Sequence, residues 1–199
     1  LIQTDPDNPT GRVYVDLDKD GNPSYEILEE VAWDVIQFDY DLEDLARQCH
    51  AICFGSLAQR TGQSRNTIYR FLDTATRTIR LFDVNLRANY YDRHILERSC
   101  EQATMVKLNH EELSIVLRTL RVRPEGEGAA AQCDALRKAF DLEWVILTRG
   151  SLGTAIHNGD QFIEGQSVEY PQDEQADSVG AGDSVSAAVL LGKVLQRPI

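Results

Sequence analysis

The sequence predicts an α/β domain in which helices cover both faces of a mostly parallel β-sheet, preceded by a small β-hairpin. Short apolar strands alternate with longer amphipathic helical patterns over most of the chain, as in consecutive βαβ units. Glycine, asparagine and arginine residues directly follow several of the strands. The chain has 199 residues, of which 42% are hydrophobic and 26% charged, a size and a balance that suit one folded domain of this class.

The first elements form the hairpin. Residues 12–17 alternate apolar and polar side chains, residues 18–22 supply turn-forming types, and residues 23–28 continue as a second strand. An isolated two-stranded hairpin is marginally stable in water, so this one has to pack on another element.

From residue 41 onward, the spacing of apolar residues predicts helices at 41–50, 64–76, 92–102, 109–120, 126–140 and 180–195. Short apolar runs predict strands at 51–54, 80–84, 104–108 and 144–148, and residues 153–163 form a second hairpin around Asn158 and Gly159. Open α/β sheets bind ligands beyond the carboxyl ends of their strands. The residues that follow each strand are therefore the candidate site.

The charge of the chain argues against several classes of partner. Acidic residues outnumber basic ones 32 to 20, for a formal net charge of −12. A binder of duplex nucleic acid or of an anionic membrane surface needs a basic face instead. The longest apolar run, residues 187–191, is too short to cross a bilayer. A small anionic ligand remains compatible with the sequence, because it needs only a local positive charge.

The cysteines indicate a reducing compartment. Cys49, Cys53, Cys100 and Cys133 do not form a Cys-x-x-Cys pair, so we expect free thiols and a cytoplasmic location. The chain starts and stops abruptly, without a signal-peptide pattern, and we expect a fragment that is truncated at both ends.

The densest motif is Asp-Ser-Val-Gly-Ala-Gly-Asp at residues 177–183, directly before a helical pattern. The first amides of a helix point in one direction, and with the helix dipole they can hold negative charge on a transferring phosphoryl group. Asp183 in the first turn can accept a hydroxyl proton, which phosphoryl transfer to an alcohol requires. The alternative is an ordinary helix start, with glycines for close packing and Asp183 as a cap.

This motif resembles the signature of the ribokinase-like sugar kinases, the phosphofructokinase-B-type family, in which threonine usually stands where this chain has Ser178. The resemblance covers essentially the whole chain and implies a three-layer α-β-α fold. It implies that Asp183 is the general base and that Asp177 lies beside a metal site, with K⁺ as a candidate ion. It also assigns the anion hole to the amides of Gly180, Ala181 and Gly182.

Asn109 and Glu112, after the strand 104–108, resemble the Asn-x-x-Glu motif of the family. The resemblance implies that they organise Mg²⁺, its waters and the nucleotide phosphates, with Glu112 as the metal-site residue. The same spacing is typical of a helix capping box. Both interpretations can hold, because a helix N-terminus also binds phosphate.

Two further loops follow strands. Arg87, in Asn-x-Arg, resembles the fructokinase and 2-keto-3-deoxygluconate kinase branches, which implies that it stabilises the transferring phosphate or contacts the substrate; a surface ion pair is the alternative. Thr148, Gly150 and Gly153 resemble the Thr-x-Gly-x-x-Gly nucleotide loop of the family, and the alternative there is an ordinary turn.

The hairpin, with Pro-Thr-Gly before it and Ala-Trp-Asp after it, is most similar to the fructokinase branch. The resemblance implies a lid that covers the sugar and excludes water, which would otherwise compete as phosphoryl acceptor. We therefore expect residues 1–34 to form a partial lid and its connection, and residues 35–199 a partial α/β core. A homodimer through the lid is a further expectation.

Together these observations predict ATP-dependent phosphorylation of a monosaccharide hydroxyl, with fructose as the best single substrate and ATP and Mg²⁺ as cofactors. The same chemistry on ribose, 2-keto-3-deoxygluconate or a nucleoside is the nearest alternative, and a non-catalytic regulatory member of the family is a second. A dinucleotide-binding oxidoreductase is disfavoured, since no Gly-x-Gly-x-x-Gly follows an early strand.

Overall fold

The structure is a computed structural model that describes residues 2–17, 23–167 and 179–198. Its internal contacts divide the chain into two compact units. The first unit comprises Leu1–Gln48 and Ala58–Ala75, and the second comprises Cys49–Leu57 and Thr76–Ile199.

The first unit contains the predicted hairpin and two helices. Strands β1 (Val13–Leu17) and β2 (Pro23–Ile27) pair antiparallel. The short 3-10 helix η1 (Ala32–Val35) follows, and then come α1 (Tyr40–Gln48) and α2 (Gly62–Thr74). Helix α2 starts and ends slightly before the predicted range 64–76. At its end, the chain leaves the helix at Ala75, whose amide still bonds to the Phe71 carbonyl.

A buried arginine stabilises the segment after the hairpin. The Arg60 guanidinium binds the Asp34 carboxylate through two hydrogen bonds, from Nε to Oδ1 at 2.8 Å and from Nη2 to Oδ2 at 2.6 Å. The same guanidinium stacks over the Trp33 ring, 4.0 Å from its centroid. Both charged side chains are at most 5% exposed, so the bidentate pair offsets the cost of removing them from water.

The second unit contains a six-stranded sheet in the order β3-β4-β5-β6-β7-β8. Its strands are β3 (Ala51–Gly55), β4 (Ile79–Asp83), β5 (Met105–Asn109), β6 (Trp144–Thr148), β7 (Thr154–His157) and β8 (Phe162–Gly165). The pairs from β3 to β6 are parallel, and β7 and β8 join the β6 edge as an antiparallel hairpin. The predicted mostly parallel sheet is therefore confirmed.

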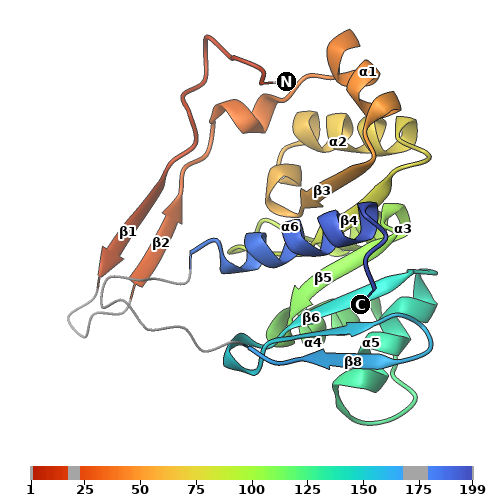
Figure 1. Ribbon diagram of the computed structural model, residues 1–199. Helices are drawn as coiled ribbons and strands as arrows, with labels where there is room; N and C mark the ends of the chain where they lie inside the picture. The colour runs from red at the N-terminus through yellow and green to blue at the C-terminus, as the bar shows by residue number, and fades with distance from the viewer. Residues whose placement is uncertain (1, 18–22, 168–178, 199) are drawn as a thin grey trace. The chain divides into compact units, whose positions relative to one another are not determined.

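Helices cover both faces of this sheet, which confirms the predicted three-layer arrangement. Helices α3 (Arg93–Gln102), α4 (His110–Leu120) and α5 (Gly128–Ala139) pack on one face, and α6 (Ala181–Val194) packs on the other (Figure 1). Under α6 the core consists of Leu81, Met105 and Ile146, against which Val185 and Val189 pack.

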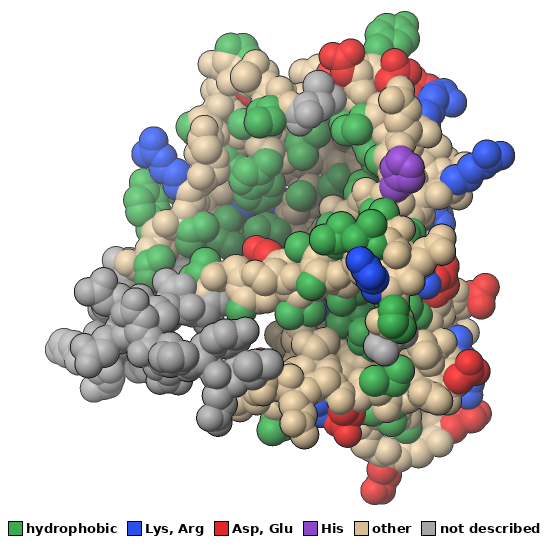
Figure 2. Space-filling view, viewed as in Figure 1, with side chains coloured by type: hydrophobic (Ala, Val, Ile, Leu, Met, Phe, Trp, Pro, Cys, Tyr) green, Lys and Arg blue, Asp and Glu red, His purple; other side chains and the backbone are tan. Residues whose placement is uncertain are grey.

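Two features of the described residues concern the length of the helices and the charge of the surface. In the part of the chain that the structure describes, no helix has both the length and the apolar character needed to cross a bilayer. On the face that Figure 2 shows, the described acidic and basic side chains are interspersed, without a continuous basic patch.

Candidate functional site

The predicted site residues that the structure describes all lie in the second unit, at the carboxyl ends of adjacent strands or at the start of α6. The strand register places Gly55 opposite Asp83, and Asn109 opposite Thr148. The carboxyl ends of these parallel strands, which are far apart in the sequence, therefore lie at one edge of the sheet. A ligand site is expected at this edge in folds of this class.

The first turn of α6 presents the Gly-Ala-Gly-Asp segment. Gly180 is the N-cap, with a φ of 80° that favours glycine, and its carbonyl accepts the Ser184 amide at 2.9 Å. The first amides of a helix, here those that follow Gly180, have no partner within the helix and are available to an anion. Asp183 is exposed in this turn, so its carboxylate is open to solvent and not sealed in the core.

The charges near this turn change the pKa of the Cys53 thiol on β3. Partial desolvation, followed by the charge of Asp83, raises the pKa of the Cys53 thiol to about 11. Lys107 opposes this rise, and the Asp183 carboxylate adds to it. The charge of Asp183 therefore acts on Cys53, so β3 and the start of α6 lie near each other.

Asn109 and Glu112 form the capping box that was the alternative interpretation of their spacing. Asn109 Oδ1 accepts the Glu112 amide at 2.9 Å, and Glu112 Oε2 accepts the Asn109 amide at 2.8 Å. The other oxygen, Oε1, accepts the amide of Leu86 at 2.8 Å. Each carboxylate oxygen keeps a second lone pair, so this geometry also fits a water-mediated contact to Mg²⁺.

Arg87 is exposed in the loop that Glu112 holds. Its Nη1 donates to the Leu86 carbonyl at 3.2 Å, and among the described residues no acidic side chain lies within ion-pair distance. The loop contains two non-glycine residues in the left-handed region, Asn85 with φ 38° and Ala88 with φ 45°. Such backbone costs about 1 kcal/mol per residue and persists where surrounding contacts fix it.

The loop after β6 lines a pocket of about 450 Å³. Asn109, Thr148 and Gly150, three of the five predicted nucleotide-binding residues, lie in its wall, together with His110, Glu111, Arg149 and Leu152. Glu112 and Gly153 do not line it. Gly153 instead has a φ of 81°, and a Cβ there would lie 2.3 Å from the Gly165 carbonyl oxygen.

The predicted metal residues are described only in part. Asp177 lies outside the described residues, and Ser178 with it. Within the described ranges, no group of three or more His, Cys, Asp or Glu side chains is arranged to hold a metal ion. A Mg²⁺ ion needs no such group when substrate phosphates and waters supply most of its ligands.

Sequence reasoning missed a buried cluster beside α6. Lys107 Nζ lies 2.7 Å from Asp83 Oδ2, and the Ser186 hydroxyl donates to the same oxygen at 2.7 Å. A lysine inside an otherwise apolar strand that helices cover on both faces was the available signal, since such a charge requires a buried partner.

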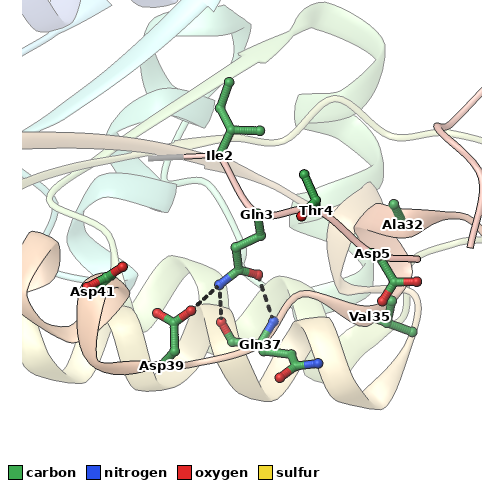
Figure 3. Close-up of a pocket in the computed structure, with 9 residues that line it drawn as sticks. All are labelled: Ile2, Gln3, Thr4, Asp5, Ala32, Val35, Gln37, Asp39 and Asp41. Carbon is green, nitrogen blue, oxygen red and sulfur yellow. Dashed lines mark hydrogen bonds between the residues drawn. The ribbon is translucent and has the colours of Figure 1, made fainter. Parts of the chain in front are cut away.

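A second pocket, of about 310 Å³, lies in the first unit and is drawn in Figure 3. Two of the three acidic side chains that line it accept hydrogen bonds within the fold. Asp39 Oδ1 accepts the Leu42 amide at 2.8 Å, and its Oδ2 accepts Gln3 Nε2 at 3.2 Å. Asp5 Oδ1 accepts the Asn8 amide at 2.7 Å. The pocket holds none of the predicted site residues.

The second unit is thus an α/β domain with a glycine-rich helix start, an exposed carboxylate and a ligand-sized pocket at the carboxyl ends of its strands, as in phosphate-binding proteins of this architecture. The family model of the pfkB family carbohydrate kinases matches residues 1–199, and the chain belongs to this family.

Known relatives agree with this assignment. The chain is 25% identical over 198 residues to PH1459 of Pyrococcus horikoshii, an uncharacterized sugar kinase, covering 96% of this chain and 57% of the relative. The structure of that kinase in complex with ATP superposes with a TM-score of 0.73 at 22% identity, covering 94% of this chain and 58% of the other.

Two further solved structures share the fold. Fructokinase with bound ATP from Xylella fastidiosa superposes with a TM-score of 0.77 at 20% identity, covering 96% of this chain and 59% of the other. Ribokinase II from E. coli, in complex with ATP and Mg²⁺, gives a TM-score of 0.74 at 15% identity, with coverages of 94% and 59%. The chain therefore spans somewhat more than half the length of the relatives that it matches.

Proposed function

We propose that the protein containing this chain is an ATP-dependent kinase that phosphorylates a hydroxyl group of a monosaccharide. The observation that carries the proposal is the exposed carboxylate of Asp183 in a glycine-rich first helical turn, on a helix that is bonded to Asp83 at the carboxyl end of β4. A base beside an anion hole is the arrangement that phosphoryl transfer to an alcohol needs.

In the proposed reaction, the sugar oxygen forms a bond to the γ-phosphorus of ATP while the bond to the β–γ bridging oxygen breaks. The hydroxyl proton passes to Asp183, and ADP leaves. The amides of Gly180, Ala181 and Gly182 stabilise the negative charge that develops on the transferring group, and exposed Arg87 adds charge-assisted hydrogen bonds.

For the nucleotide, we assign Asn109, Thr148 and Gly150 to contacts in the pocket that they line, with Gly153 shaping the loop. Glu112 would hold Mg²⁺ through waters, and the ion neutralises phosphate charge when bound. Asp177 would lie beside a site for K⁺. Solved relatives that contain ATP, one of them with Mg²⁺, support ATP and Mg²⁺ as cofactors.

Fructose is the proposed acceptor, on the basis of the hairpin, the Asn-x-Arg loop and the fold shared with a fructokinase. Ribose, 2-keto-3-deoxygluconate and nucleosides are the alternatives. Residues 1–34 would serve as a lid on a core of residues 35–199, and the lid would also form the contact of a homodimer. The four cysteines are free thiols, which favours the reducing cytoplasm as location.

The test is sugar-dependent ADP release by the full-length protein over a panel of hexoses, pentoses and nucleosides. Asp183→Asn removes the base, and we expect turnover to fall by about 10² to 10⁴ while nucleotide affinity stays within about twofold. Asp160→Asn, an exposed acid in the turn between β7 and β8, is the matched control and keeps full turnover. Release that no sugar stimulates, or an Asp183→Asn variant that loses only ATP affinity, would refute the proposal.

A further inference from the structure

The buried cluster beside α6 links three elements. Asp83 and Lys107 lie opposite each other in the register of β4 and β5, and their side chains are 10% and 7% exposed. Ser186 of α6, 4% exposed, donates its hydroxyl proton to Asp83 at 2.7 Å. A buried ion pair gives little net stability, because desolvation opposes the attraction, so its contribution to stability does not by itself explain this cluster.

The cluster lies directly against the first turn of α6. The Ser186 hydroxyl oxygen is 3.2 Å from the Gly182 carbonyl oxygen. A Cβ on Gly182 would lie 3.3 Å from Lys107 Nζ, so the ammonium group lies close to this turn. Lys107 itself is buried beside this turn.

The charge of Lys107 also reaches beyond its partner. It lowers the pKa of the Cys53 thiol, against the opposite effects of Asp83 and Asp183. Lys107 thus lies among the charged groups that surround the first turn of α6, and not in an isolated structural pair.

We propose that Lys107, Asp83 and Ser186 are positioning residues that fix the first turn of α6 on strands β4 and β5 before substrate binds. The role in catalysis rests on the proposed function, because the turn carries the anion-hole amides and Asp183. Helix ends fray, and donors stabilise a transition state best when they need no reorganisation. The cluster gives this helix end a connection to the middle of the sheet.

The principal variant is Ser186→Ala, which breaks the link to α6 and leaves the ion pair intact. In the full-length protein we expect the amides that bond to the carbonyls of the first turn of α6, beginning with Ser184 on Gly180, to exchange about fivefold to tenfold faster, the effect of one lost hydrogen bond. We expect kcat to fall by a similar factor while the KM for ATP stays within about twofold, and Ser186→Thr, which keeps the hydroxyl, to restore both values.

Ser184→Ala is the matched control for exchange. Ser184 makes the same kind of bond to the turn, from Oγ to the Gly180 carbonyl at 3.0 Å, but it is exposed. Its removal should change exchange by less than about twofold, because an exposed hydrogen bond is readily replaced by water.

A double variant tests the role of the Asp83–Lys107 ion pair. Lys107→Met alone leaves Asp83 charged and buried, which can prevent folding. Asp83→Asn combined with Lys107→Met removes both charges together, and we expect a folded protein with accelerated exchange in the same turn. Exchange within twofold of wild type in both Ser186→Ala and this double variant would overturn the positioning role. A wild-type protein without sugar-dependent ADP release would refute the proposed function, while accelerated exchange would still establish the link to α6.

Discussion

Glu112 offers a direct test of the site geometry, because its two oxygens accept amides from separate segments. The substitution Glu112→Gln replaces one oxygen by an NH₂ group, which then faces the amide of either Leu86 or Asn109. Hydrogen bonds to charged groups contribute about 1.5–3 kcal/mol each, so we expect the free energy of unfolding to fall by about 2 kcal/mol. For a domain of this size, that corresponds to a decrease in Tm of about 4–8 °C.

The measurement is the thermal or denaturant midpoint of the purified protein. The control is Glu111→Gln, the preceding residue on α4, which is exposed and should change stability by less than about 0.5 kcal/mol. If both variants shift the midpoint equally, the Glu112 carboxylate does not hold the two amides, and the assignment of this residue to the site geometry is wrong.

Two further predictions follow from the backbone and from a titration. Gly153→Ala would place a Cβ 2.3 Å from the Gly165 carbonyl oxygen at a φ of 81°, so the free energy of unfolding should fall by about 2 kcal/mol or more in a denaturant titration. The control Gly150→Ala, with φ 58° and no atom within 4 Å, should cost only about 1 kcal/mol, and an equal loss would contradict the close approach. Alkylation of Cys53 by iodoacetamide, followed by peptide mass spectrometry, should rise with an apparent pKa of about 11 in the folded protein. The Cys thiol of an unfolded chain has a pKa of about 8.5. Between that pH and the higher pKa of the folded protein, only the unfolded chain loses the Cys53 proton, so the free energy of unfolding falls as pH rises. An apparent pKa of about 8.5 in the folded protein would contradict the partly buried, acid-flanked environment of Cys53.

The architecture of the second unit was predictable because each of its elements has a local signal. Short apolar runs predicted the strands, and the spacing of apolar residues predicted the helices. The Asn158-Gly159 turn predicted the β7–β8 hairpin. Residues placed after strands in the sequence lie at the strand ends in space, and three of them share one pocket. Local pattern and topology are sufficient for this level of description.

The pairings across the fold were not predictable. The partner of Lys107 depends on the register of β4 and β5, which one sequence does not specify, and Ser186 has no distinguishing sequence pattern. Glu112 could be predicted as a helix cap, but its bond to the Leu86 amide depends on the path of a distant loop. Long-range contacts of this kind decide the geometry of the candidate site.

The bond between Glu112 and the Leu86 amide also limits how the loop after β4 can change in length. An inserted residue between Asp83 and Leu86 would move this amide away from the carboxylate and shift Arg87 with it. An insertion after Ala88 leaves the bond in place. We therefore expect natural length variation in this loop to fall between Ala88 and the start of α3, and changes before Leu86 to occur together with replacement of Glu112.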